Sequence, residues 1–536
     1  MAQDLATEKG KRLKASGGVS TSLVGYHVDG IESRRDPFYW QVNANLNFQV
    51  FGMSIPFSAS FSQQDRSFTQ PFNQVGFSPK YKAVTGHVGY RNMSFSTYTL
   101  GGITFLGLGV EVKPKDHWVS GGAMWGRLQR AVAQGGNDGA IVGIAAFERW
   151  GYATKFNLGT KKSNFDFIYF HGKDDATSIP DSNITEGFTP GENLVWGINT
   201  HQQLSKKIKF NFEYAFSAYT EDTRNNEVIL ETYSYYNNLG GVFTPNSTTQ
   251  FNKAIKTDLN YKAEKYNLKL MYRRIDPNYK TMGAPFLNND MEDITGNVAW
   301  QMFKKKVNVA VAAGFQRNNL DDTQQQQVIR AVSSLNVNYA VNDKLNLTTN
   351  FANFNTSTNQ VQFIQIDSLE YFQVTKNAGF GANYRLGKGK VRQNLMFNSS
   401  WQDANDSQDN ASQVLNFNTG HQMAFTKIDL TVGTSINYNN SQFGTLNNSA
   451  YGPTLSLSKK FFKKKVNQTL AVSTLTTMSE SEKVSSTSNV RASTNYRIKK
   501  SHTFSLNLIY LTQSSFQENG RSYQEYRATF QYSYKF

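Results

Sequence analysis

Apolar and polar residues alternate along most of this chain. In residues 38–50 every even position carries an apolar or aromatic side chain, whereas the odd positions from 41 to 49 carry Asn or Gln. The same two-residue period recurs in 208–217 and in 504–508. Because successive side chains of a β-strand point to opposite faces, this pattern predicts strands with one apolar face and one polar face.

The clearest example of this pattern is the last segment, residues 526–536. Every second residue there is apolar or aromatic, and Arg, Thr, Gln, Ser and Lys stand between them. A C-terminal strand that alternates in this way and ends on Phe resembles the terminal assembly signal of bacterial outer-membrane β-barrel proteins. The resemblance implies that the protein is inserted into the cell outer membrane by barrel-assembly machinery, which would read Phe530, Tyr532, Tyr534 and Phe536.

The connections between the predicted strands are alternately short and long. The short ones are rich in lysine, and Phe-Lys-Lys-Lys-Val-Asn occurs both at 303–308 and at 462–467. Outer-membrane barrels have short periplasmic turns and longer external loops. A repeated turn also fits duplicated hairpins in an up-and-down barrel. We therefore predict basic periplasmic turns at Lys304, Lys305, Lys306, Lys463, Lys464 and Lys465.

These patterns predict an all-β fold, namely a single large up-and-down antiparallel transmembrane β-barrel of about 26 strands (24–26) with no separate plug domain. An even count requires two strands within residues 66–101, at about 72–81 and 84–96. We assign residues 11–536 to the barrel and residues 1–10 to a short periplasmic segment of a mature sequence without its signal peptide. Soluble sandwiches or a propeller are the alternatives, but sheets seldom exceed ~10 strands before splitting, and no blade repeat recurs.

Composition agrees with a barrel and excludes several other classes. Mean hydropathy is −0.52, and no run approaches the ~18 consecutive apolar residues of a membrane-spanning helix. Aromatic residues make up 14% of the chain, with 39 Phe and 27 Tyr, which is typical of the two aromatic girdles of a membrane barrel. Cysteine is absent, so disulfide scaffolds, thiolate metal sites and cysteine nucleophiles are excluded.

A closed barrel of this size would be roughly 50 Å across and would leak unless something fills its lumen. We expect inward-folded loops or another polypeptide to do so. The candidate loop is 221–248, with Tyr233, Tyr235 and Tyr236; the alternative is a loop on the cell surface. A second unusual segment, 76–151, holds 15 of the 40 glycines. Glycine at such density indicates either a strongly curved wall or the close approach of another backbone.

Mixed charges in the glycine-rich segment are candidates for lining the lumen, namely His87, Arg91, Glu111 and Arg127. Such charges would select solutes or bind a plug, or would form a wall network that is satisfied internally. The seven histidines lie in no Gly-x-Ser-x-Gly or His-Glu-x-x-His motif, so we predict no enzyme, no catalytic residues and no cofactor. The stretch Asp403, Asn405, Asp406 and Asp409 offers oxygen ligands for calcium, but its spacing favours a solvated acidic loop, and we assign no metal site.

The formal net charge of +16 raises nucleic acid as a partner, but lysines gather at short turns rather than in a groove, so we predict none. These turns would lie beside anionic lipid headgroups, with which each lysine can pair for about 1 kcal/mol. They would alternatively contact an acidic periplasmic protein. The expected partners are therefore membrane lipids and lipopolysaccharide, the assembly machinery and other envelope proteins.

The segment 72–130 contains Gly-Phe-Ser-Pro-Lys-Tyr at 76–81, Gly-Tyr-Arg-Asn-Met-Ser-Phe-Ser at 89–96 and Trp-Gly-Arg-Leu-Gln-Arg at 125–130. It resembles uncharacterised outer-membrane barrels of Bacteroidota-type bacteria, which implies fold and compartment but no site residues. The lipopolysaccharide-transport barrel is similar in strand number, but its periplasmic domain has no counterpart here. Two functional hypotheses remain, a transport or export channel and a docking barrel within an envelope complex.

Overall fold

The computed structural model describes residues 13–536 except 64–69, 116, 134–144, 181–186, 240, 325, 361–370, 407–409 and 500. Strands dominate this part of the chain. The 3₁₀ helix η2 spans Ser234–Asn238. The strands are β1 (Leu13–Asp29), β2 (Phe38–Val50), β3 (Met53–Ser62), β4 (Gln74–Phe77), β5 (Lys80–Tyr81), β6 (Val84–Ser94), β7 (Gly101–Val112), β8 (Val119–Gln129), β9 (Glu148–Gly159), β10 (Ser163–Asp175), β11 (Glu192–Gln202), β12 (Ile208–Thr220), β13 (Thr249–Lys262), β14 (Tyr266–Ile275), β15 (Met291–Met302), β16 (Val307–Arg317), β17 (Gln326–Ala340), β18 (Leu345–Gln360), β19 (Tyr371–Leu386), β20 (Val391–Asp406), β21 (Ala411–Phe425), β22 (Leu430–Phe443), β23 (Leu446–Phe461), β24 (Val466–Ser479), β25 (Glu482–Arg497), β26 (His502–Ser515) and β27 (Tyr523–Lys535).

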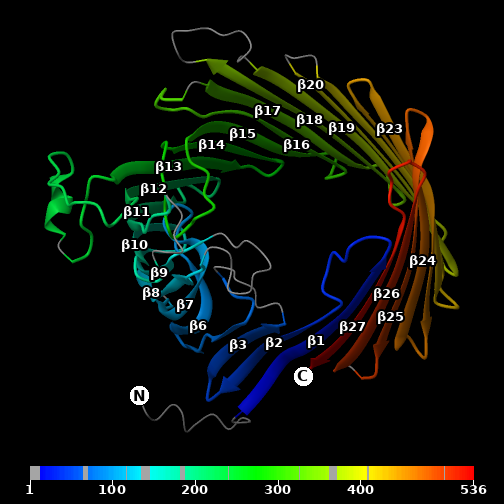
Figure 1. Ribbon diagram of the computed structural model, residues 1–536, viewed down its shortest axis with the longest axis horizontal. Helices are drawn as coiled ribbons and strands as arrows, with labels where there is room; N and C mark the ends of the chain where they lie inside the picture. Colours follow the sequence, from blue (N-terminus) through cyan, green and yellow to red (C-terminus); the bar gives the residue numbers. More distant parts are fainter. Residues whose placement is uncertain are drawn as a thin grey trace.

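The strands form one closed antiparallel sheet (Figure 1). Strand β1 pairs with β27 from Gly18↔Lys535 to Asp29↔Gln524, and this pairing closes the ring. The short strands β4 and β5 both lie between β3 and β6, so they occupy one interrupted position. The described strands therefore make a barrel of 26 positions, as the sequence predicted. The predicted pair of strands within 66–101 corresponds to β4–β5 and β6.

The repeated lysine sequence forms the same turn twice. Phe303, Lys304 and Lys305 have φ angles of 50°, 55° and 68°, and Phe462, Lys463 and Lys464 have 50°, 53° and 67°. Three successive residues are thus left-handed in each turn, a conformation that costs non-glycine residues about 1–2 kcal/mol each. In each turn the fourth residue donates its backbone N–H to the carbonyl of the Phe, at 3.2 Å.

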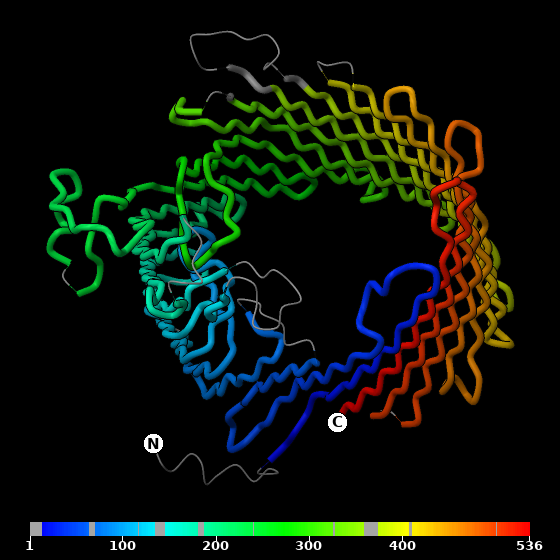
Figure 2. Tube along the Cα trace, in the orientation of Figure 1, coloured from blue at the N-terminus to red at the C-terminus, as the bar shows by residue number. Residues whose placement is uncertain are grey.

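Two segments leave the wall in opposite directions. In Figures 1 and 2 the connection between β14 and β15 lies inside the ring, whereas the connection between β12 and β13 projects outside it. Each segment packs on a different buried apolar cluster. The molecule therefore has apolar packing on both faces of one part of the wall, around β7 to β14.

The outer face of the barrel is broadly apolar. Large side chains such as Leu108, Trp125 and Phe530 stand exposed there at 55%, 53% and 39% of their surface. Residues of this kind recur around the ring, which matches the apolar band by which outer-membrane barrels contact lipid. Among the residues described, no helix is long and apolar enough to cross a membrane.

Candidate functional site: the barrel lumen

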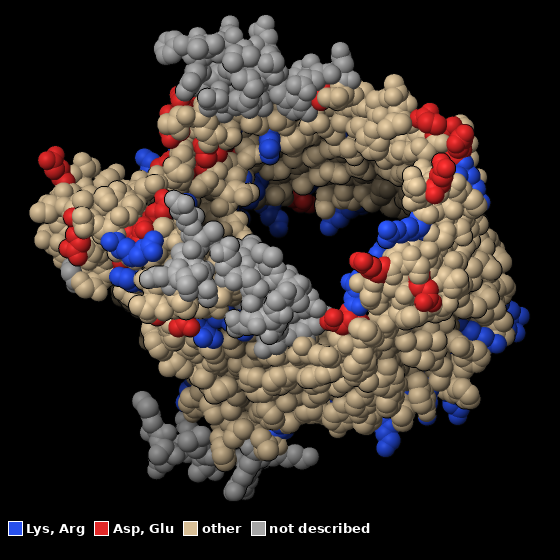
Figure 3. All heavy atoms as spheres, viewed as in Figure 1, with Lys and Arg blue, Asp and Glu red and all other residues tan. Residues whose placement is uncertain are grey.

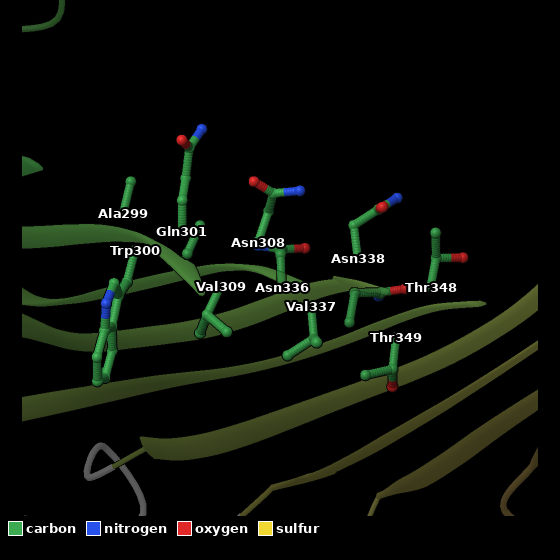
Figure 4. Close-up of a pocket in the computed structure, with 12 residues that line it drawn as sticks. Ala299, Trp300, Gln301, Asn308, Val309, Asn336, Val337, Asn338, Thr348 and Thr349 are labelled. Atoms are coloured by element: carbon green, nitrogen blue, oxygen red, sulfur yellow. The ribbon is translucent and has the colours of Figure 1, made fainter. Parts of the chain in front are cut away.

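The register between strands identifies the lumen face. Directly paired residues of antiparallel strands share a face. Ile275, which packs against the inward segment, pairs with Met291 of β15, and every second residue from there, through Ala299 and Gln301, faces the lumen. Figure 4 shows the same alternation, with Gln301, Asn308 and Asn338 pointing one way and Trp300, Val309 and Val337 the other way. Sequence alternation therefore separates a wet lumen from an apolar exterior.

An apolar layer covers the lumen side of the wall from β7 to β14. It consists of residues 93–100 and 276–290, which we call the inner layer. Tyr98, Leu100, Tyr279 and Met282 of this layer are at most 2% exposed. They pack on wall residues that are also buried, namely Phe105, Met124, Leu128, Ala153, Ile168, Phe170, Val195, Ala215, Ala254 and Ile275.

Hydrogen bonds fix the two segments of the inner layer to each other. The Tyr279 hydroxyl donates to the Tyr98 carbonyl at 2.6 Å, and the Thr281 hydroxyl donates to the Thr99 carbonyl at 2.9 Å. The Gly101 N–H donates to the Gly283 carbonyl at 2.9 Å. Because these groups are buried, each would be costly to leave unpaired, so the two segments form one unit.

Asn193 of β11 fixes this unit to the wall. Its Nδ2 donates to Ser217 Oγ at 2.8 Å and to the Ala218 carbonyl at 3.0 Å, and its Oδ1 accepts from the Met282 N–H at 3.0 Å. The Ser217 hydroxyl donates in turn to the Lys280 carbonyl at 2.7 Å. Asn193 is completely buried. Its amide oxygen, rather than water, is therefore the hydrogen-bond partner of the Met282 backbone N–H.

Glycine makes the close approach of the inner layer to the wall feasible. A Cβ at Gly109 of β7 would lie 2.5 Å from Met93 Sδ, and a Cβ at Gly283 would lie 2.2 Å from the Thr99 carbonyl oxygen. Both distances are far below van der Waals contact. Gly109 lies in the glycine-rich segment and supports the close approach of another backbone there, whereas Gly283 permits contact between the two segments of the inner layer.

Three of the four predicted lumen residues lie together on β6 and β7. Met124 belongs to the apolar core under the inner layer and pairs with Gly109, which pairs with His87, so His87 faces the lumen; by strand alternation Arg91 and Glu111 do too. His87 Nε2 lies 3.7 Å from Glu111 Oε2, and Lys113 Nζ lies 2.8 Å from Glu111 Oε1. Arg91 donates to Ser58 Oγ at 2.7 Å. These contacts are those of a wall network, and whether the residues select solutes remains a prediction.

Arg127 does not join this group. Its strand neighbour Trp125 and its partner Trp150 stand on the outer face, since Met124 and Ala153 face inward. Arg127 Nη1 lies 3.3 Å from Glu148 Oε2. The assignment of Arg127 to the lumen is therefore wrong, and its two-residue spacing from Trp125 was the signal that could have shown this.

The loop 221–248 also differs from expectation. Phe216 follows the inward-facing Ala215 and so faces outward, and the Tyr236 ring lies 6.4 Å from it and 5.1 Å from the Phe251 ring. The Tyr233 ring lies 4.8 Å from the Phe251 ring, and Tyr235 is 50% exposed. The inward folding predicted for Tyr233, Tyr235 and Tyr236 is wrong, because an apolar surface outside the wall takes up the loop.

The lumen beside the inner layer carries paired charges. A recess of about 280 Å³ is lined by residues that include Asp166, Glu213, Lys256 and Asp258. Lys155 Nζ lies 2.7 Å from Asp166 Oδ2, and Glu213 Oε1 accepts from the Thr97 N–H of the inner layer at 2.9 Å. Sequence alternation alone did not identify this group, since its members come from separate strands.

The opposite part of the lumen, from β15 to β24, is lined mainly by neutral amides and hydroxyls. Two recesses lie there, one of about 460 Å³ between β15 and β18 and one of about 400 Å³ around β20 to β22. The lumen is thus chemically divided, with apolar and charged groups on one side and mainly uncharged polar groups on the other, where Arg330, Arg385 and Arg392 also share the lumen face.

The acidic stretch at the end of β20 contacts nearby polar groups. Asp403 accepts from Gln413 Nε2 at 3.1 Å, and Asp406 accepts from the Asn410 backbone N–H at 2.9 Å. Asp409 lies outside the described residues, as does the segment 1–10. Within the described ranges, no group of three or more acidic or histidine side chains is arranged to hold a metal ion.

A closed antiparallel barrel with an even strand count, a polar lumen and an apolar exterior is the architecture of an outer-membrane β-barrel, and it places the protein in the cell outer membrane. No protein-family model and no curated protein matches the chain.

Several solved barrels are distantly similar. The copper transporter OprC aligns with 99% of this chain and 81% of its own, at 8% identity and a TM-score of 0.39. Acinetobacter baumannii OccAB2 aligns over 70% of this chain and 97% of that chain, at 9% identity and a TM-score of 0.31. Pseudomonas aeruginosa OccK2 aligns over 97% and 98%, at 10% identity and a TM-score of 0.30. Likeness at this level assigns no family, substrate or partner.

Proposed function

We propose that the protein is an outer-membrane channel that transports or exports polar solutes through its lumen. One observation carries the proposal: an opening remains across the ring, as Figure 3 shows, and the strand register places amide and hydroxyl side chains on its β15 to β22 side. The inner layer covers the β7 to β14 side of this opening. It would narrow the channel rather than close it.

Single-channel recording in planar bilayers tests this proposal. The purified protein should give discrete current steps. Replacing residues 280–288 by a short glycine linker should enlarge the steps, because that segment lies within the ring. A matched deletion in 228–242, on the outside of the wall, should leave step size unchanged. Silence from all three proteins would overturn the channel.

The second candidate is a docking barrel of an envelope complex, which the outer loop favours. Ile229 of that loop is 89% exposed, and Tyr235 and Val242 are 50% and 38% exposed. Exposed apolar groups mark a contact with another protein or with the membrane, and extraction distinguishes the two. Extraction in mild detergent should then recover a stoichiometric partner that Ile229→Asp releases, whereas recovery of the barrel by itself would contradict docking.

The finer envelope assignments belong to the same proposal. We propose that the lysine turns face the periplasm and bind anionic lipid headgroups, and that the barrel also contacts lipopolysaccharide. We further propose that barrel-assembly machinery recognises the final strand. The short N-terminal segment would be periplasmic, and the chain would come from a Bacteroidota-type bacterium. Loss of membrane insertion on removal of Phe536 would support the assembly signal, and unchanged insertion would contradict it.

A further inference from the structure

Two rows of small polar side chains cross the lumen wall from β15 to β22. Each row follows residues that are directly paired from strand to strand, so its members share the lumen face. The first row is Gln301, Asn308, Asn338, Thr348, Gly381, Asn398, Asn418 and Asn437, and the second is Ala299, Ala310, Asn336, Asn350, Gly379, Ser400, Asn416 and Asn439.

The two rows connect the two neutral recesses. The recess of about 460 Å³ lies on the β15 to β18 part of both rows, and the recess of about 400 Å³ lies on the β20 to β22 part. Gly379 and Gly381 stand between them, and the side chains of Asn350 and Thr348 lie over these two glycines. We call the two recesses and the polar rows that join them the track, and Figure 4 shows Gln301, Asn308 and Asn338 of its first part pointing to the same side.

The track climbs through the membrane rather than circling at one level. Seven steps between strands at ~4.8 Å each give a length of about 34 Å. Barrel strands tilt by about 40°, so a row perpendicular to them rises by roughly 20 Å. The positions of the row along the strands agree with this rise. Asn308 lies one residue from the start of β16, whereas Asn437 lies well inside β22.

The chemistry of the two rows is uniform. They contain amides, hydroxyls, alanine and glycine, and no charged or aromatic side chain, and Leu475 of β24 also lines the second recess. Asn418 Nδ2 donates to Asn437 Oδ1, Asn439 Nδ2 donates to Asn416 Oδ1, and Asn416 Nδ2 donates to Ser400 Oγ at 3.2 Å. An amide has two donors and an oxygen that accepts twice, so each asparagine keeps capacity toward the lumen.

We propose that this track binds an uncharged, hydroxyl-rich chain, namely a neutral oligosaccharide, along its length. Hydroxyls donate and accept at once, as amides do, and a neutral chain requires no ionic partner. An extended polypeptide fits less well, because its side chains are charged at many positions and the two rows offer no ionic partner. The proposal rests on the channel function and names its solute.

Calorimetry and current recording with maltohexaose test the proposal. The detergent-solubilised protein should bind maltohexaose, and the sugar should cause transient blocks of the channel current. The double variant Asn338→Leu with Asn418→Leu should weaken binding at least tenfold. If that variant does not fold, Asn338→Ala with Asn418→Ala makes the same test with smaller side chains. The control Asn45→Leu with Asn507→Leu alters lumen positions off the track and should bind as the unaltered protein does.

The possible outcomes distinguish a failure of the track proposal from a failure of the channel proposal. Failure of maltohexaose to bind at millimolar concentration while current steps persist would overturn the track proposal and leave the channel. Silent bilayers with retained calorimetric binding would overturn the channel and leave the binding site. Equal losses of maltohexaose affinity in the track and control variants would overturn the track proposal. Tighter binding of hexagalacturonate, or of an uncharged unfolded peptide, than of maltohexaose would also overturn it.

Discussion

Replacing Asn193 by alanine tests whether one buried amide holds the inner layer against the wall. The side chain makes three hydrogen bonds, two to β12 and one from the Met282 N–H. Each contributes about 1 kcal/mol net, and a buried donor left unpaired adds a penalty of about 1–3 kcal/mol. Only the bond from the Met282 N–H joins Asn193 to the inner layer. Its loss at about 1 kcal/mol, with about 2 kcal/mol for leaving that buried N–H unpaired, should destabilise the docked layer by about 3 kcal/mol in Asn193→Ala.

Hydrogen–deuterium exchange measures this change locally. At about 1.4 kcal/mol for each factor of ten, amides of residues 278–287 should exchange about a hundredfold faster, provided that local opening limits their exchange. Amides in β20 to β22 should be unaffected, because the barrel wall stays closed. Current traces of the variant should also become noisier as the layer detaches and returns.

Asn199→Ala is the matched control, since Asn199 lies on the same strand and faces the same side. Its Oδ1 has no hydrogen-bond partner among the described atoms. Exchange in 278–287 should match that of the unaltered protein. Unchanged exchange in Asn193→Ala, or an equal increase in Asn199→Ala, would refute the reasoning.

Three further predictions concern the inner layer and the turns. Gly283→Ala should speed proteolysis of 276–290, because its Cβ would meet the Thr99 carbonyl oxygen at 2.2 Å; unchanged cleavage would contradict the contact. Burial raises the pKa of Tyr279 well above its ordinary value near 10, so its contribution to stability is complete below about pH 10 and is lost as the pH rises beyond it. Cleavage of the layer should therefore increase from pH 8 to pH 11, and less so in Tyr279→Phe. Lys305→Gly should raise the free energy of unfolding by about 0.5–1 kcal/mol, because it relieves a φ of 68°. Lys306→Gly, outside the left-handed residues, should not raise it. Thermal unfolding in detergent measures both variants.

The sequence allowed the wall to be predicted because each strand repeats a local rule. Alternation gave the strands, parity required the pair that became β4–β5 and β6, and the lysine repeat predicted two similar turns. Arg127 was misplaced because it was grouped with other charges, although its spacing from Trp125 follows the same rule.

The inner layer and the outer loop could not be predicted in this way. Whether a loop turns inward depends on which wall face offers it an apolar surface, and Phe216 with Phe251 outside the wall holds Tyr236. The polar track likewise depends on register between strands, such as Asn398↔Asn418↔Asn437. A period of two assigns faces within a strand but not neighbours across strands.

The inner layer also has a consequence for the order of folding. Its hydrogen bonds join residues far apart in sequence, with 181 positions between Tyr279 and Tyr98 and 182 between Thr281 and Thr99. Such contacts carry a large loop-closure cost until the intervening strands have paired. Tyr98, Leu100 and Met282 must therefore remain uncovered until the wall from β6 to β14 has curled, and an insertion intermediate stalled before that point would present these side chains to chaperones.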